Sequence, residues 1–112
     1  MAKIEIWTGP ENEPIHVFEC PGCKCSHGVW IDKPHRNGAQ WQFNGNFNSP
    51  TITPSVLIRY GKDQRCHLFV TDGKIRYLGD CTHELKGQTI EMKDLNEDSP
   101  DTNNVYIKYR KV

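Results

Sequence analysis

The sequence lacks any long run of apolar residues. No stretch of the 112 residues approaches the roughly 18 consecutive apolar residues that mark a membrane-spanning helix. The first residues, MAKIEIWTG, also lack the apolar segment of a secretory signal peptide. We therefore expect a protein without a membrane association that works in the cytoplasm.

The chain also lacks a net charge. Lys and Arg total 14, Asp and Glu total 14, and the formal net charge at pH 7 is zero. Domains that bind nucleic acid usually concentrate positive charge on one face, and the short basic stretch YIKYRKV does not supply such a face. The charge balance argues against a nucleic acid and favours a protein or peptide partner.

Helical periodicity is nearly absent, and short alternating runs separated by turn signals such as TGPENEP and NGNFNSP take its place. These runs predict strands over residues 3–7, 15–19, 29–32, 41–43, 56–60, 66–70, 74–78, 89–92 and 105–109. The pattern is typical of an all-β fold, a small sandwich or a partly open barrel of short antiparallel strands. We expect one domain over residues 1–112, with an acidic mobile loop at about 94–104.

The strongest hairpin signal is CHLFV-TDGK-IRYL, because Asp72-Gly73 suits a two-residue turn whose central residues have positive φ. Pairing Thr71 with Lys74 places one set of side chains on one face of the sheet, and this set consists of Cys66, Leu68, Val70, Ile75 and Tyr77. The opposite face then carries His67, Phe69, Arg76 and Leu78. If the second strand runs on, Cys81 joins the Cys66 face and Asp80 joins the His67 face.

Hydrophobic residues make up only 36% of the chain, and a core this small often needs a covalent or metal staple. In the cytoplasm, five cysteines are better suited to metal binding than to disulfides. Cys20-Pro-Gly-Cys23 has the spacing of a zinc knuckle, which supplies two of the four ligands that zinc prefers. The chain has no second CxxC, so the remaining ligands are expected from His27, Cys66, Cys81, another histidine or Cys25, which is the weakest candidate because it lies so close to Cys23.

Two other interpretations of the CxxC stay open. A thioredoxin-like redox pair usually lies at the start of a helix, whereas GVWID, which follows here, is typical of a strand. The two thiols can also be free and half-buried without any function. The strand pattern favours the metal site over the redox site.

Hydrolysis by an activated nucleophile needs a hydroxyl or thiol, a base within hydrogen-bond reach, and a group that orients the base. Ser55 lies in the hydroxyl-rich stretch NSPTITPSV, and His67 lies on the hairpin. The stretch DCTHEL adds Asp80 and His83. Ser55 with His67 or His83 as the base and Asp80 as the orienting group forms a candidate catalytic set. Alternatively, the hydroxyl groups satisfy a proline-rich bend, and the histidines are structural or bind metal.

Three stretches together resemble domain-of-unknown-function family 6527, a small family found in bacteria, prophages and phages. They are CPGCKCSHGVWID, WQFNGNFNSPTITPSVLI and CHLFVTDGKIRYLGDCTHELKGQTIEM, and the resemblance covers roughly residues 16 to 95. Some members have been called ammonia monooxygenases, a chemistry that requires a membrane-embedded metalloenzyme. We reject that name, because this chain has no candidate spanning segment.

The resemblance implies a small zinc-binding β domain from a bacterium or a phage. Some relatives are associated with bacterial ubiquitin-like conjugation, where the domain is thought to act as a peptidase on the modifier. Carried over to this sequence, Ser55 becomes the nucleophile, His67 or His83 the base, and Asp80 the orienting group. The family often has serine at position 81, which favours His27 over Cys81 as a ligand.

The sequence leaves two classes of function open. The first is a zinc-stabilised hydrolase, a peptidase or isopeptidase with a Ser–His pair. In a variant of this class, zinc with three ligands activates water, although no HExxH is present. The second is a non-catalytic zinc-binding β module, from a phage or a bacterium, that binds a host protein. A short distance between Ser55 and a histidine would favour the enzyme.

Overall fold

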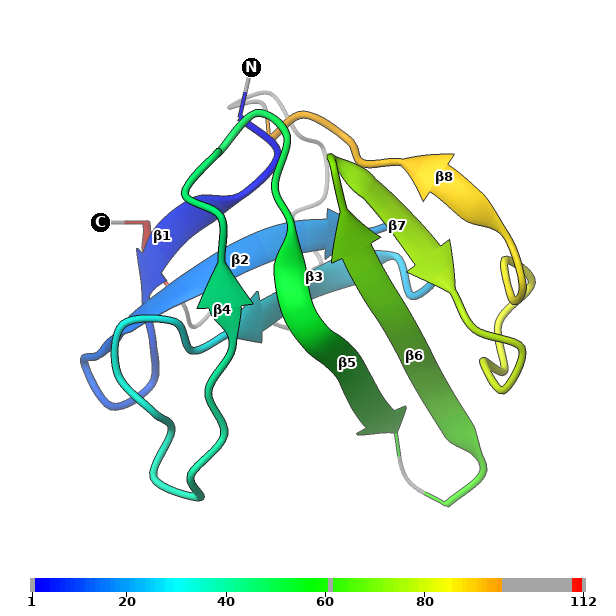
Figure 1. Ribbon diagram of the computed structural model, residues 1–112. Helices are drawn as coiled ribbons and strands as arrows, with labels where there is room; N and C mark the ends of the chain where they lie inside the picture. The colour runs from blue at the N-terminus through cyan, green and yellow to red at the C-terminus, as the bar shows by residue number, and fades with distance from the viewer. Residues whose placement is uncertain (1, 61, 96–109, 112) are drawn as a thin grey trace.

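A computed structural model describes residues 2–60, 62–95 and 110–111, and strands rather than helices make up this part of the chain (Figure 1). One antiparallel sheet has the order β3-β2-β1-β9, with β1 Glu5–Thr8, β2 Pro14–Cys20, β3 Cys25–Val29 and β9 Arg110–Lys111. The other has the order β4-β5-β6-β7-β8, with β4 Gln42–Phe43, β5 Ile52–Tyr60, β6 Gln64–Thr71, β7 Lys74–Tyr77 and β8 Thr89–Glu91. The all-β prediction is confirmed. Over the same residues, no helix is long and apolar enough to cross a membrane.

The two open sheets share one hydrophobic core, so the fold is a sandwich rather than a closed barrel. In Figure 1 the sheet containing β5, β6 and β7 lies in front of the sheet containing β1, β2 and β3. The buried residues that fill the space between them are Ile4, Phe18, Cys20, Val29, Ile52, Val56, Cys66, Leu68, Val70, Ile75, Tyr77, Cys81 and Met92. Cys20 and Cys66 therefore enter the core from opposite sheets.

Most predicted strands overlap observed ones, but the strand predicted at 29–32 lies at 25–29 instead. The cause is the knuckle, which forms the tip of the β2–β3 hairpin. Lys24 has φ of 60° and ends the turn, and Cys25 then pairs directly with Cys20. The strand predicted at 105–109, and the predicted loop at 94–104 beyond residue 95, lie outside the described residues.

The β6–β7 hairpin has the predicted register, with Thr71 opposite Lys74 and Leu68 opposite Tyr77. Asp72 and Gly73 have φ of 50° and 77°, as this turn requires. The predicted inward face is confirmed, because its five members are buried: Cys66, Leu68, Val70, Ile75 and Tyr77. His67 consequently lies on the outward face of the sheet.

The chain turns sharply after β7 rather than continuing as a strand. The N–H of Leu78 donates to the carbonyl of His67 over 2.9 Å, and the N–H of Cys81 donates to the carbonyl of Leu78 over 3.2 Å. Asp80 therefore reaches the outward face of β6 from a turn, and not by a continuation of the strand, which was the condition for its predicted position.

A bulge in β5 lies on the other side of β6 from this turn. Ile52 pairs with Val70 and Val56 pairs with Leu68, so three residues of β5 oppose one residue of β6. The bulge contains Pro54, which has no N–H to contribute to the ladder, and the Thr53–Pro54 peptide bond is cis. Bulges of this kind re-aim side chains, and this one ends at Ser55.

Candidate active site and metal centre

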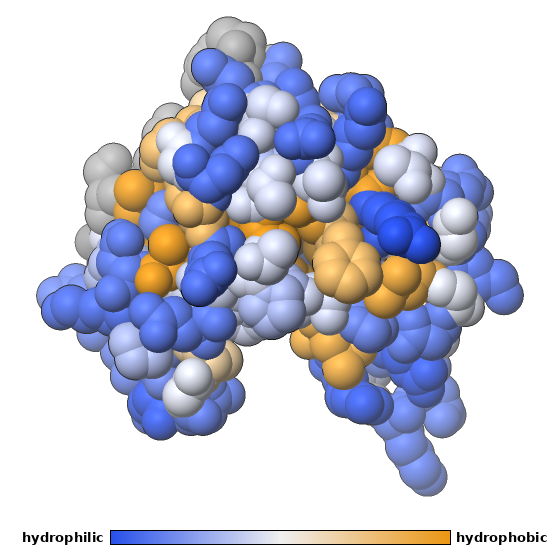
Figure 2. All heavy atoms as spheres, viewed as in Figure 1, coloured by the Kyte–Doolittle hydropathy of each residue, from blue (hydrophilic) through white to orange (hydrophobic). Residues whose placement is uncertain are grey.

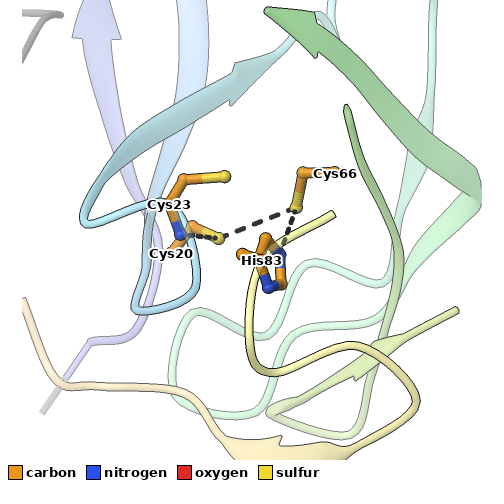
Figure 3. A group of neighbouring side chains, drawn as sticks. All are labelled: Cys20, Cys23, Cys66 and His83. Carbon is orange, nitrogen blue, oxygen red and sulfur yellow. Dashed lines mark hydrogen bonds between the residues drawn. The ribbon is translucent and has the colours of Figure 1, made fainter. Parts of the chain in front are cut away.

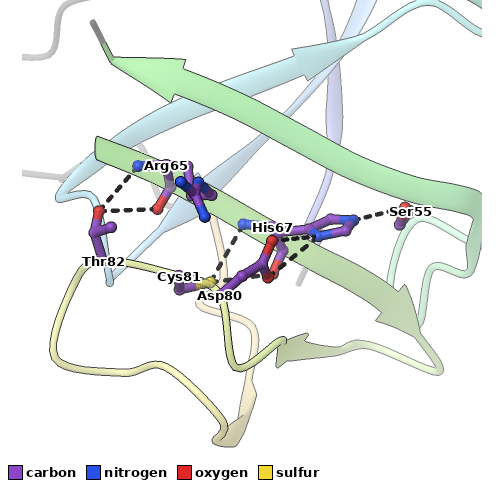
Figure 4. A network of polar contacts seen from close by, with 6 residues as sticks. All are labelled: Ser55, Arg65, His67, Asp80, Cys81 and Thr82. Carbon is purple, nitrogen blue, oxygen red and sulfur yellow. Dashed lines mark hydrogen bonds and ion pairs between the residues drawn. The ribbon is translucent and has the colours of Figure 1, made fainter. Parts of the chain in front are cut away.

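Ser55, His67 and Asp80 form a continuous chain of polar contacts on the outward face of the second sheet (Figure 4). The Oγ atom of Ser55 lies 3.0 Å from Nε2 of His67. The Nδ1 atom of His67 lies 3.1 Å from Oδ2 and 3.3 Å from Oδ1 of Asp80. The three residues come from β5, β6 and the turn after β7, so the fold brings together the predicted set.

The protonation pattern follows from the partners. An ionised carboxylate only accepts hydrogen bonds, so the ring proton of neutral His67 lies on Nδ1, facing Asp80. The Nε2 atom of His67 then carries a lone pair toward the hydroxyl of Ser55. The arrangement can accept the hydroxyl proton while the imidazole keeps its orientation.

The carboxyl group of Asp80 is tuned for this role. Desolvation raises its pKa, but hydrogen bonds with His67 and with its own backbone N–H, and the nearby charges of His67 and Arg65, outweigh this and lower the pKa. The side chains of His67 and Asp80 are 25% and 44% exposed, and Ser55 is half-buried. The polar set is thus open to a substrate from solvent.

The backbone of Ser55 is held independently of its hydroxyl. The indole N–H of Trp41 donates to the carbonyl of Ser55 over 3.1 Å. Trp41 is in turn held by its backbone N–H, which donates to the carbonyl of Trp30 over 2.8 Å. The bulge is therefore supported from the side of β4 as well as by β6.

A second group of side chains lies at the inner side of the hairpin and joins the two sheets (Figure 3). One ligand atom from each member lies within 4.8 Å of the others, and the members are Cys20, Cys23, Cys66 and His83. The Sγ atoms of Cys20 and Cys66 are 3.9 Å apart, and Nε2 of His83 is 3.3 Å from Sγ of Cys66. Cys20 and Cys23 belong to the knuckle, Cys66 belongs to β6, and His83 follows the turn after β7.

The group fits a tetrahedral zinc ion. Bonds of about 2.3 Å to sulfur and about 2.0 Å to nitrogen separate tetrahedral ligand atoms by about 3.5 to 3.8 Å. The separations of 3.9 and 3.3 Å lie close to this range. Three thiols and one imidazole are also a ligand set that zinc commonly takes in structural sites.

Neighbouring groups already support this geometry. The N–H of Cys23 donates to Sγ of Cys20 over 3.4 Å, and the hydroxyl of Tyr77 lies 3.1 Å from the same sulfur. That hydroxyl also accepts from the N–H of Gly22 over 3.2 Å, and the ring of Tyr77 packs edge-on against His83 at 4.6 Å. Tyr77 therefore orients ligands from two different segments.

The thiols share negative charge unevenly. Hydrogen bonding with Cys23 and then with Cys66 holds the pKa of the Cys20 thiol far below its usual range. The hydrogen bond with Cys20 is also the largest cause that raises the pKa of Cys23 and of Cys66. The pKa of Cys20 is thus lowered relative to those of Cys23 and Cys66, and a bound dication would stabilise the thiolate form of all three.

The structure places two of the predicted ligands outside this group. His27 is buried on β3, with its ring 5.8 Å from that of Phe18. Cys81 is directed to the backbone of His67, because the turn after β7 replaces the expected strand. His83, which the sequence offered as a possible base, is instead the fourth member of the candidate metal-binding group. The sequence gives only a weak signal for it: DCTHEL follows the β6–β7 hairpin, and a hairpin returns the chain toward the start of its first strand, where Thr82 contacts Arg65.

A family model described as bacterial ubiquitination-like system serine protease (BubE) matches residues 2–78, which is more than half of the chain. The chain belongs to this family. The match corrects the resemblance to domain-of-unknown-function family 6527, because the BubE family is a different one. No curated protein and no solved structure matches the chain significantly.

The BubE match covers Ser55 and His67, together with the three cysteines of the metal group. It ends before Asp80 and His83. The serine protease described for the BubE family agrees with the peptidase interpretation drawn from the sequence, and it implies a protein as substrate or partner.

Proposed function

We propose that this protein is a serine peptidase or isopeptidase that cleaves a bond to a ubiquitin-like modifier, with Ser55 as its nucleophile. The observation that carries the proposal is the 3.0 Å contact from Ser55 Oγ to His67 Nε2, in a ring whose Nδ1 is bound by Asp80. This geometry, open to solvent, favours the enzyme over the non-catalytic binding module.

The first half of the reaction transfers an acyl group to Ser55. As Oγ attacks the carbonyl carbon of the scissile bond, His67 Nε2 takes the hydroxyl proton. The imidazolium that forms is stabilised by the carboxylate of Asp80, which holds Nδ1–H throughout. His67 then gives its proton to the leaving amine, and the peptide or isopeptide bond breaks.

The second half releases the acyl group. Water takes the place of the amine, and His67 removes its proton as the oxygen attacks the ester carbonyl. The ester bond breaks, Ser55 Oγ recovers a proton from His67, and the products are a carboxylic acid and an amine.

The proposed zinc is structural. Cys20, Cys23, Cys66 and His83 supply four ligands, the number of a closed tetrahedral site. When bound, zinc supplies folding stability by linking the two sheets. The ligand atoms meet on the inner side of the sheet, to which Cys66 of β6 points, whereas His67 lies on the outer face of β6, so Ser55, His67 and Asp80 carry out the reaction themselves.

The proposed substrate is a protein, and it approaches the outward face of the second sheet. Leu57 is directly opposite His67 in the register and is 43% exposed, which offers an apolar contact beside the nucleophile. Figure 2 views this face, which has hydrophobic residues in its middle and a notch at its lower edge.

We also propose that residues 1–112 are one zinc-binding domain that works in the cytoplasm. The single core shared by both sheets supports one domain rather than two. All five cysteines are free thiols, which supports a reducing compartment.

Replacement of the nucleophile tests the proposal. We expect Ser55→Ala to abolish cleavage of a modifier–protein conjugate, and also covalent labelling by a fluorophosphonate, without a change in melting temperature. Ser49→Ala, a serine in the loop before β5, is the matched control and should retain both. Cleavage by Ser55→Ala at the wild-type rate would rule out this serine as the nucleophile.

A further inference from the structure

The turn that carries Asp80 interrupts the ladder of the sheet at His67. In a regular antiparallel pair, Leu78 and His67 would exchange two backbone hydrogen bonds. Here the N–H of Leu78 donates to the His67 carbonyl, but the Leu78 carbonyl accepts from Cys81 N–H within the turn. The N–H of His67 therefore needs another acceptor.

The thiol of Cys81 is that acceptor (Figure 4). The N–H of His67 donates to Sγ over 3.2 Å, and the S–H donates back to the carbonyl of His67 over 3.1 Å. One side chain thus takes the place of a missing backbone pair. It does so at the residue that would act as the base.

The next residue, Thr82, makes the same kind of double hydrogen bond with a backbone group of β6. The hydroxyl of Thr82 accepts from the N–H of Arg65 over 2.9 Å and donates to its carbonyl over 3.1 Å. The N–H of Thr82 also donates to that carbonyl over 3.0 Å. The segment after Asp80 is therefore fastened to β6 at two consecutive outward-facing positions.

Asp80 depends on this fastening more than on its own packing. Its side chain is 44% exposed, whereas Cys81 is only 4% exposed and lies in the core. We infer that Cys81 is a positioning residue for the proposed reaction, because its thiol fixes the turn at the distance from which Asp80 reaches Nδ1 of His67. The inference rests on the proposed catalytic roles of Ser55, His67 and Asp80.

Three substitutions separate the hydrogen bonds of the thiol from its volume. Cys81→Ser keeps one donor and one acceptor, whereas Cys81→Ala removes both, and Cys81→Val removes both while filling the space. Val70→Ala is the control for lost stability, since Val70 is buried on β6 and faces away from His67.

We expect Cys81→Ala and Cys81→Val to lower kcat by about 10- to 100-fold with little change in KM, because a small misplacement of a catalytic group costs about this much. Fluorophosphonate labelling of Ser55 should slow in parallel. Cys81→Ser should stay within a few fold of wild type. Val70→Ala should lower the melting temperature but keep kcat at temperatures where it is folded.

Two results would overturn the inference. One is a wild-type kcat in Cys81→Val or Cys81→Ala, and the other is a loss in Cys81→Ser equal to that in Cys81→Val. If Cys81→Ala does not fold, Cys81→Val and Cys81→Ser decide the matter between them. Failure of the proposed function is distinguishable, because Ser55→Ala would then keep its activity whatever the Cys81 variants do.

Discussion

The imidazole of His83 lies directly over Gly22 and leaves no room there for a side chain. A Cβ atom added at Gly22 would clash with Cε1 of His83 and would lie 2.6 Å from Nε2 and 2.7 Å from Nδ1 of the same ring. The glycine of the CPGC knuckle is thus required by a residue 61 positions later in the sequence, since 83 minus 22 is 61. The close approach is what brings the imidazole to the three sulfurs.

We therefore predict that Gly22→Ala weakens zinc binding. The added methyl group displaces His83, and the site is left with three thiols. We expect the zinc affinity, measured by competition with a chromophoric chelator, to fall by about 10-fold or more. Gly79→Ala is the control, because a Cβ at Gly79 meets nothing within 4 Å. Equal affinities in the two variants would contradict the role of Gly22.

We predict that the purified protein holds about one zinc per chain, as a closed four-ligand site requires. A chelator should lower its free energy of unfolding by several kcal/mol, because metal binding and folding are coupled. Cys66→Ser should lose the zinc, whereas Cys81→Ser should keep it, although both cysteines are buried. Elemental analysis checks both variants, and zinc loss in Cys81→Ser would return Cys81 to the ligand set.

Asp80→Asn tests the orienting carboxylate. The amide offers Nδ1 of His67 a weaker partner and permits the wrong tautomer, so we expect kcat to fall on the order of 10²- to 10⁴-fold. Asp63→Asn, an exposed aspartate in the β5–β6 turn, is the matched control and should retain wild-type kcat. An Asp80→Asn enzyme as fast as the control would remove Asp80 from the mechanism.

The lowered pKa of Asp80 also predicts how the stability of the fold depends on pH. The pKa of Asp80 is lowered in the folded protein, so the group binds a proton more readily in the unfolded chain. Its contribution to stability is present above the unfolded pKa of about 4 and is lost as the pH falls through the lower folded pKa. We expect the melting temperature of the wild type to exceed that of Asp80→Asn at neutral pH, and the difference to shrink as the pH falls below about 4 and to vanish below the folded pKa. A difference that grows toward acid pH would contradict this assignment.

The parts that could be predicted from sequence depend on local rules. Asp72-Gly73 determines the turn, the turn determines the register, and the register separates Cys66 from His67. These steps need only the two-residue period of a strand. The candidate catalytic set came instead from the residue types that hydrolysis needs, and it left both His67 and His83 open as the base.

The remaining parts depend on how the chain ends a strand and crosses between sheets. Cys81 would share the face of Cys66 only if β7 ran on past Leu78, but the turn after Leu78 directs Cys81 to the backbone of His67 and brings His83 to the metal group. His27 has suitable spacing from the knuckle, yet Cys25 already pairs with Cys20, so β3 carries His27 away along the strand. Turns of this kind have no periodic signal.

The alternation along β6 links the two sites during folding. Cys66 and His67 are neighbours, one on each face, and a slip of one residue in the pairing of β6 would exchange them. A slipped strand would bury the base and turn the metal-binding sulfur to solvent. A chain with the slipped register could not bind zinc, so zinc binding would stabilise only the chain in which the catalytic strand has the correct register.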